Sequence, residues 1–127
     1  MKEVNYKQWI FDDVTPLYIQ ISNHLKYEIL SGRICPGEIL PSIRDMAKIL
    51  QVNPNTIARV YRVLKSDKLI DSVRTNRFLV TQDTMHIDVQ KEKVINEICA
   101  LFLSSMESMG YSTSQVRRIL EQCSSKI

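Results

Sequence analysis

The side chains with the clearest chemical role in this sequence lie in one short segment, residues 53–62. It opens with hydrogen-bonding groups in the run Asn53-Pro54-Asn55-Thr56 and continues with Arg59 and Arg62. Asparagine amides can read the edge of adenine, threonine can meet a phosphate or a thymine methyl group, and guanidinium groups pair with phosphates. The segment therefore favours contact with duplex DNA. Two structural alternatives stay open: Asn53 as a helix cap only, and the arginines as solvated charges.

Side chains of this kind read DNA when two helices, joined by a tight turn, hold them outward. Such a turn requires a small residue where the backbones approach and apolar residues at fixed positions around it. The block 43–62 has the small residue, Ala47, and apolar residues at helix-turn-helix spacing: Met46, Leu50, Val52, Ile57 and Val60. The turn residue Gln51 stands where glycine is frequent, and a left-handed glutamine there would cost about 1 kcal/mol.

Start and stop signals define the helices of this region. Thr15 as N-cap with Pro16 at the first helical position predicts an earlier helix, which Ser31-Gly32 ends. Ser42 with Asp45 predicts a capped start for the first helix of the block. Together with the helix that follows Asn53, the chain up to about residue 68 is expected to form three helices.

A change of pattern follows Lys68. The short β-forming runs Leu69-Ile70 and Phe78-Leu79-Val80 flank a polar stretch, and this arrangement predicts a β-hairpin. At the other end of the chain, the apolar cluster Trp9-Ile10-Phe11 lies in an irregular segment. We expect this N-terminal arm to pack onto the helical domain.

Two further helices are predicted after the hairpin. The first begins near Thr84 and ends at Gly110, and the second begins at Ser112, whose spacing to Gln115 suits a helix start. Both carry apolar stripes, formed by Ile87, Val94, Ile95, Ile98, Leu101, Phe102 and Met109 and by Val116, Ile119, Leu120 and Cys123. Stripes of this length exceed what one winged helix can cover, which predicts a homodimer. The alternative is packing against the same chain.

Charge and composition narrow the function classes. Lysines and arginines outnumber aspartates and glutamates by eight to three in residues 41–81, whereas the ratio from residue 82 onward is five to six. The concentrated positive charge favours a nucleic-acid partner. The sequence shows no nucleophile–base pair, phosphate loop or metal-ligand spacing, so we expect neither an enzyme nor a cofactor or metal site. Cys35, Cys99 and Cys123 are expected to be small buried hydrophobes, and His24 and His86 surface or packing residues.

No apolar run approaches the roughly 20 residues that a membrane-spanning helix needs, and no hydrophobic signal region follows the N-terminus. We therefore expect a cytoplasmic protein with no membrane partner.

The region from residue 15 to 81 resembles the GntR family of bacterial regulators, and within it the YtrA-like subfamily. The resemblance is carried by Pro16-Leu17-Tyr18-x-Gln20-Ile21, Gly32-x-x-x-Pro36-Gly37-Glu38-x-Leu40-Pro41-Ser42-x-Arg44, Val52-Asn53-Pro54-Asn55-Thr56, Arg59-x-Tyr61-x-x-Leu64 and Leu69-Ile70. It implies a winged helix whose hairpin tip enters the minor groove, and an operator with two-fold symmetry. It also implies control of a transporter or cell-envelope operon.

The wing departs from the pattern of the family, which usually has Arg-Gly-x-Gly at the tip. Here the tip is Arg74-Thr75-Asn76-Arg77, without glycine, so the usual close approach of main chain to DNA is in doubt. Asn76 can still adopt a left-handed conformation, and Arg77 can reach the groove through its side chain. Lys68 also stands where the family often has glycine.

Carried over position by position, the family's DNA contacts or their immediate neighbours are Arg44, Asn53, Asn55, Thr56 and Arg59, and the start of the wing tip is Arg74 and Thr75. Arg62, on the same helix, and Arg77, in the wing, are added from their own positions. The candidate DNA-binding residues are therefore Arg44, Asn53, Asn55, Thr56, Arg59, Arg62, Arg74, Thr75 and Arg77.

The sequence thus predicts a mostly α fold with a small β-hairpin: a winged helix-turn-helix domain followed by a two-helix C-terminal dimerisation tail. The expected divisions are an N-terminal arm at 1–14, the DNA-binding domain at 15–81 and the helical tail at 84–127. The predicted function is a sequence-specific DNA-binding transcription regulator, a dimeric repressor. The alternative is a winged-helix module that binds protein, which would not need the basic segment. A small-molecule effector, if one exists, would have to bind at the dimer interface or between domains, because the tail is too small to enclose a pocket.

Overall fold

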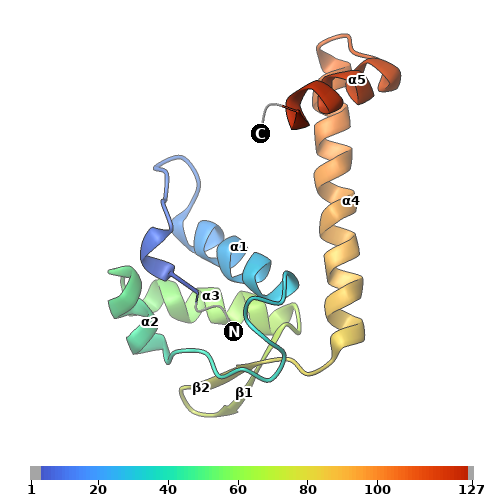
Figure 1. Ribbon diagram of the computed structural model, residues 1–127. Coiled ribbons are helices and arrows are strands. Elements are labelled where there is room, and N and C mark those ends of the chain that lie inside the picture. The colour runs from blue at the N-terminus through green and yellow to red at the C-terminus, as the bar shows by residue number, and fades with distance from the viewer. Residues whose placement is uncertain (1–3, 126–127) are drawn as a thin grey trace. The chain divides into compact units, whose positions relative to one another are not determined.

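The computed structural model describes residues 4–125, and the chain divides into two compact units, Met1–Val89 and Gln90–Ile127. Residues 1–3 of the predicted arm and 126–127 of the predicted tail lie outside the described part. The elements of the first unit, seen in Figure 1, are the short 3-10 helix η1 (Tyr6–Gln8), α1 (Leu17–Leu30), α2 (Ile43–Leu50), α3 (Pro54–Ser66), β1 (Ile70–Arg74) and β2 (Arg77–Val80). α4 (Thr84–Ser108) begins in the first unit and continues into the second, which also contains α5 (Thr113–Ser124).

Three of the predicted helix starts are confirmed. Ser42, Asn53 and Ser112 are the N-caps of α2, α3 and α5, and each accepts a backbone N–H in its own first turn. At Ser112 the Gln115 side chain accepts the N-cap N–H in return, which completes a capping box. Local hydrogen bonding therefore accounts for where these helices begin.

The prediction that Thr15 caps the first helix was wrong. α1 begins at Leu17 with Pro16 as its N-cap and no side-chain cap. The backbone of Thr15 instead bonds to two side chains. Its N–H donates to Asp12 Oδ1 over 3.0 Å, and its carbonyl accepts a hydrogen bond from the Gln20 amide over 2.7 Å. The N–H groups of Thr15 and, next, Val14 lower the pKa of the Asp12 carboxyl, since both donate to its Oδ1 and stabilise the ionised form.

The core of the first unit is aliphatic and lies between α1, α2, α3 and the hairpin. α1 and α3 pack along one another, and α2 packs on α3. Side chains with almost no exposed surface come from every one of these elements: Ile21, Leu25, Ile29, Met46, Ile57, Val60, Leu64, Leu69, Ile70 and Val80. Burial of such side chains is the main force that holds α3 in place.

The hairpin is a two-stranded antiparallel sheet in which Ile70 pairs with Val80 and Asp71 with Leu79. The segment before α2 attaches to its outer edge, where the Val80 N–H donates to the Glu38 carbonyl and the Leu40 N–H donates to the Phe78 carbonyl. The hairpin is therefore tied to the chain that leads into α2.

The second unit, taken by itself, leaves much of its apolar surface uncovered. Apolar side chains of α4 within this unit, and of the segment that follows it, are at least one-third exposed: Ile95, Ile98, Leu101, Phe102, Leu103, Met109 and Tyr111. On α5, Val116 is buried and Leu120 is half exposed. None of the helices within residues 4–125 combines the length and apolar character needed to cross a membrane.

The expected burial of the cysteines was wrong. Cys99 and Cys123 are exposed and Cys35 is half-buried, all three as free thiols. The two exposed cysteines belong to α4 and α5, whose apolar faces a single copy of the second unit does not cover.

Candidate nucleic-acid interface

One side of α3 is buried and the opposite side carries polar and cationic groups. Ile57, Val60, Tyr61 and Leu64 face the core, whereas Asn55, Arg59 and Arg62 are exposed. The three exposed residues follow one another at i, i+4 and i+7, so they form a single stripe along the helix. We call Asn55, Arg59 and Arg62 the α3 stripe. Its groups can donate hydrogen bonds to bases and phosphates.

The start of α3 uses Asn53 as its cap. Asn53 Oδ1 accepts the Asn55 N–H over 2.8 Å, and Pro54 occupies the first turn. The side-chain carbonyl of Asn53 is therefore engaged, as the structural alternative expected, while its amide N–H groups have no partner within residues 4–125. Asn55 is exposed beside it and Thr56 is partly buried.

The turn between α2 and α3 has the predicted left-handed residue. Gln51 has φ 57° and ψ 49°, and its N–H donates to carbonyls at the end of α2. Ala47 is almost fully buried there, and its carbonyl also accepts the Val52 N–H over 3.0 Å. A glutamine thus fulfils the role that glycine usually has at this turn.

Tyr61 connects the elements that surround the α3 stripe. Its hydroxyl donates to the Pro41 carbonyl over 2.7 Å, and its ring meets Phe78 of β2 edge-on with centroids 4.8 Å apart. Burial raises the pKa of this phenol well above its ordinary value, so it remains a neutral donor. In the sequence Tyr61 stands out only as part of the motif Arg59-x-Tyr61-x-x-Leu64, because neither partner is near it in the chain.

Arg44 lies in the exposed first turn of α2. The turn begins at Ser42, whose Oγ accepts the Asp45 N–H over 3.1 Å. The Tyr61–Pro41 bond joins this start of α2 directly to α3. Arg44 and the α3 stripe therefore belong to helices that are fixed to one another.

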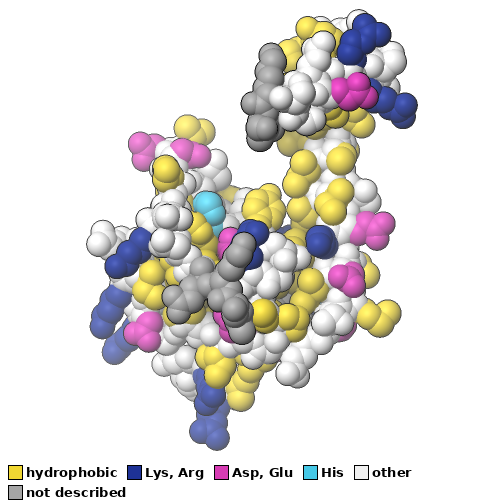
Figure 2. All heavy atoms as spheres, in the orientation of Figure 1, with side chains coloured by type: hydrophobic (Ala, Val, Ile, Leu, Met, Phe, Trp, Pro, Cys, Tyr) yellow, Lys and Arg dark blue, Asp and Glu magenta, His cyan; other side chains and the backbone are white. Residues whose placement is uncertain are grey.

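The wing residues are all exposed from Asp71 to Arg77. Arg74 pairs with Arg77 in the strand register, and Asn76 between them has φ 66°, the left-handed conformation that an asparagine can adopt. Lys68, at φ 59°, is also left-handed. Figure 2 shows Lys and Arg side chains at the tip of the hairpin and along the edge beside α2. The tip therefore presents side chains, with Arg74, Thr75 and Arg77 beside the turn.

Arg59 makes a contact that sequence reasoning missed. Its guanidinium carbon lies 3.7 Å from the centroid of the Tyr18 ring, in the first turn of α1. Tyr18 belongs to the motif that carries the resemblance, but it is 41 positions away from Arg59 in the chain. No local pattern links the two residues.

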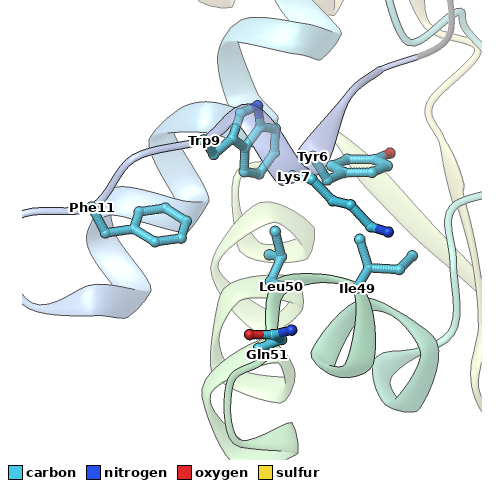
Figure 3. A pocket seen from close by; sticks show the side chains of 7 residues that line it. All are labelled: Tyr6, Lys7, Trp9, Phe11, Ile49, Leu50 and Gln51. Atoms are coloured by element: carbon cyan, nitrogen blue, oxygen red, sulfur yellow. The ribbon is translucent and has the colours of Figure 1, made fainter.

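The N-terminal arm packs against α1 and lies beside the end of α2. Trp9 stacks on His24 of α1 with ring centroids 4.6 Å apart. Between the arm and the end of α2 is an open hollow of about 270 Å³ (Figure 3), lined by Tyr6, Lys7, Trp9, Phe11, Ile49, Leu50 and Gln51. The Tyr6 phenol beside it has its pKa raised to about 12, chiefly by burial and then by Glu38. Packing of Trp9 and Phe11 on His24 holds the arm against α1, and the hollow beside it extends to Gln51.

Comparison with known proteins identifies this arrangement. Residues 17–80, which include α1, α2, α3 and the hairpin, match the family described as bacterial regulatory proteins, gntR family. The chain belongs to the GntR family. It is accordingly a DNA-binding transcription regulator with a winged helix-turn-helix fold and C-terminal helices.

Individual relatives agree with this assignment and with the YtrA-like subfamily. The HTH-type transcriptional regulator YhcF of Bacillus subtilis is 28% identical over 106 residues, which cover 84% of this chain and 88% of that protein. The HTH-type transcriptional repressor YtrA of the same species is 40% identical over 60 residues, 47% of this chain and 46% of its own.

Solved structures show the same fold. A GntR family transcriptional regulator from Listeria monocytogenes superposes with a TM-score of 0.84 at 30% identity, covering 88% of this chain and 98% of that one. YtrA from Sulfolobus acidocaldarius, a GntR-family transcription factor, gives 0.52 at 27% identity, with coverage of 93% and 98%.

Proposed function

We propose that this GntR protein is a homodimeric repressor that binds a two-fold symmetric operator with the α3 stripe in the major groove. The observation that supports it most is the division of α3 into a fully buried apolar side and an exposed side of Asn55, Arg59 and Arg62. In helix-turn-helix proteins the first turn of the second helix meets base edges. Residues 15–81 would then bind DNA and residues 84–127 would join two copies.

The candidate contacts divide by chemistry. Asn55 and Thr56 at the start of α3 suit base edges, and Asn53 can add its amide N–H groups. Arg44, Arg59 and Arg62 suit the phosphates that flank the groove. At the wing, the exposed Arg74, Thr75 and Arg77 would enter the minor groove as side chains, replacing the main-chain contact of a glycine tip.

The regulatory role is proposed from the likeness to the repressor YtrA of Bacillus subtilis. Repression of a transporter or cell-envelope operon in the cytoplasm, with or without a small-molecule effector, would fit this subfamily. Recovery of bound fragments from the genome would identify the operon. A reporter placed behind such a fragment should be less active when the protein is present.

Substitution of Asn55→Ala or Arg44→Ala should weaken binding to a duplex selected from random DNA by about 1–3 kcal/mol each. Asn55→Ala removes a base contact, and Arg44→Ala removes a phosphate contact. Gel-shift titration measures both, and circular dichroism checks that the variants stay folded.

Arg33→Ala is the matched control. Arg33 is an exposed arginine of the same unit, lies just after α1 and is already paired with Glu28. This variant should bind like the wild type. Equal affinity of all three variants would refute the assigned interface. Weak binding to DNA without a steep salt dependence would instead favour the protein-binding alternative.

A further inference from the structure

The contact between Arg59 and Tyr18 brings together a helix of the DNA interface and one outside it. Tyr18 lies in the first turn of α1, is partly buried, and is held there by the packing of α1 on α3. Arg59 is exposed and extends over the face of the Tyr18 ring, with 3.7 Å between guanidinium carbon and ring centroid. At this distance the ring quadrupole attracts the cation.

The geometry leaves Arg59 available for another partner. Within residues 4–125 the one ion pair is Arg33 with Glu28, so no described carboxylate neutralises Arg59. The Arg59 guanidinium also donates no hydrogen bond to any residue within 4–125, so its N–H donors stay free while the carbon lies 3.7 Å from the ring centroid. The contact therefore restricts the side chain without occupying its hydrogen-bonding groups.

The side chain of Tyr18 makes no other polar contact within residues 4–125. Its hydroxyl has no hydrogen-bond partner among the residues that the structure describes. The exposed Asn55 lies one turn before Arg59 on the same stripe. The ring face of Tyr18 is thus the feature that selects one orientation of Arg59 beside the start of α3.

We propose that Tyr18 is a positioning residue for DNA binding: its ring holds the Arg59 guanidinium in the orientation in which it meets a backbone phosphate. The inference rests on the proposed function of the α3 stripe. A long arginine side chain loses rotamer freedom when it binds, and a side chain already restricted in the free protein loses less. Tyr18 contributes to affinity through Arg59 and makes no contact with DNA.

The test compares Tyr18→Leu and Tyr18→Phe by gel-shift titration on the selected duplex. Tyr18→Leu keeps an apolar side chain but removes the π face, and should weaken binding about 3- to 10-fold. Tyr18→Phe keeps the π face and should bind within about twofold of the wild type. Tyr27→Leu, the same change at an exposed position of the same helix, is the matched control and should have no effect.

The dependence on Arg59 is measured in a double-mutant cycle. In an Arg59→Ala background, Tyr18→Leu should cause no further loss, because the group that it positions is absent. In the free protein, the NMR signals of the Arg59 δ protons should be shifted by the ring current of Tyr18 and should return to ordinary values in Tyr18→Leu.

Three results would overturn the proposal while leaving the proposed function intact. The first is an equal loss of affinity for Tyr18→Phe and Tyr18→Leu, which would indicate a hydroxyl–phosphate contact. The second is the same loss from Tyr18→Leu in the presence and in the absence of Arg59. The third is full affinity of Arg59→Ala under conditions in which Asn55→Ala binds more weakly. Failure of the wild-type protein to bind any duplex would instead refute the proposed function.

Discussion

At the scale of single residues, three non-glycine residues within 4–125 hold left-handed backbone conformations at turns. Gln51 has φ 57°, Lys68 has φ 59° and Asn76 has φ 66°. The left-handed region costs a residue with a Cβ atom roughly 1–2 kcal/mol, and asparagine tolerates it better than glutamine or lysine. The turn at Gln51 is the most instructive, because it joins the two helices that carry Arg44 and the α3 stripe.

Gln51→Gly should stabilise the protein by about 1 kcal/mol, since relief of left-handed strain outweighs the added flexibility of the unfolded chain. Urea unfolding followed by circular dichroism measures the change in unfolding free energy. Gln51→Ala, which keeps a Cβ atom at φ 57°, is the control and should show no gain. A lower stability for the glycine variant would contradict this account of the turn.

At the scale of elements, the tip of the wing has side chains at the positions where the family usually has glycine. Asn76 supplies the left-handed turn, and arginines flank the tip at both strand ends. Lys65 of α3 donates to Ser72 Oγ of β1 over 2.8 Å, which braces the wing against α3. A tip built this way would bind DNA through cationic side chains, and its contribution should be electrostatic.

Arg77→Ala should therefore reduce the slope of log affinity against log salt concentration by about 1, because one cationic side chain that displaces counterions from the minor groove is lost. Binding isotherms at several salt concentrations give the slope. Thr75→Ala, an uncharged change at the same tip, should leave it unchanged. An unaltered slope for Arg77→Ala would indicate that the wing lies away from DNA.

The sequence predicts the elements well where local chemistry defines them. The capping residues Ser42, Asn53 and Ser112, and the left-handed positions Gln51 and Asn76, follow from neighbours within a few residues. Thr15 failed as a cap because the side chains of Asp12 and Gln20 bind its backbone.

The contacts that the sequence did not predict join distant parts of the chain. Tyr61 reaches Pro41 across 20 positions, and Tyr18 reaches Arg59 across helices that pack together. Such pairs depend on tertiary packing, which leaves no periodicity or spacing to detect. The residues of the candidate interface could therefore be proposed from the sequence, but the contacts of Tyr61 with Pro41 and of Tyr18 with Arg59 could not.

At the scale of the whole molecule, the exposed apolar side chains of α4 are the feature that a single chain leaves unexplained. Ile98 is 52% exposed and Leu101 is 71% exposed. Large exposed apolar surfaces on a protein mark an interaction site. Two copies related by a two-fold axis would cover this surface and present two α3 stripes to the two halves of an operator.

We expect the protein to be a dimer at micromolar concentration by light scattering, and Ile98→Glu to shift it to a monomer. In a two-fold dimer the substitution places two like charges in the interface. Asn96→Glu, an exposed position on the opposite side of α4, is the control and should remain dimeric. A monomeric wild type would refute the dimer.

The bond from Tyr61 to Pro41 and the contact of its ring with Phe78 have a consequence for how DNA is chosen. Through these two contacts one side chain of α3 is linked both to the start of α2 and to the hairpin, the parts that would meet the two grooves of a duplex in the proposed complex. If α3 and the wing both contact DNA as proposed, their fixed spacing would discriminate between duplexes by width and twist, and DNA that must deform to fit would lose affinity even where no base is touched.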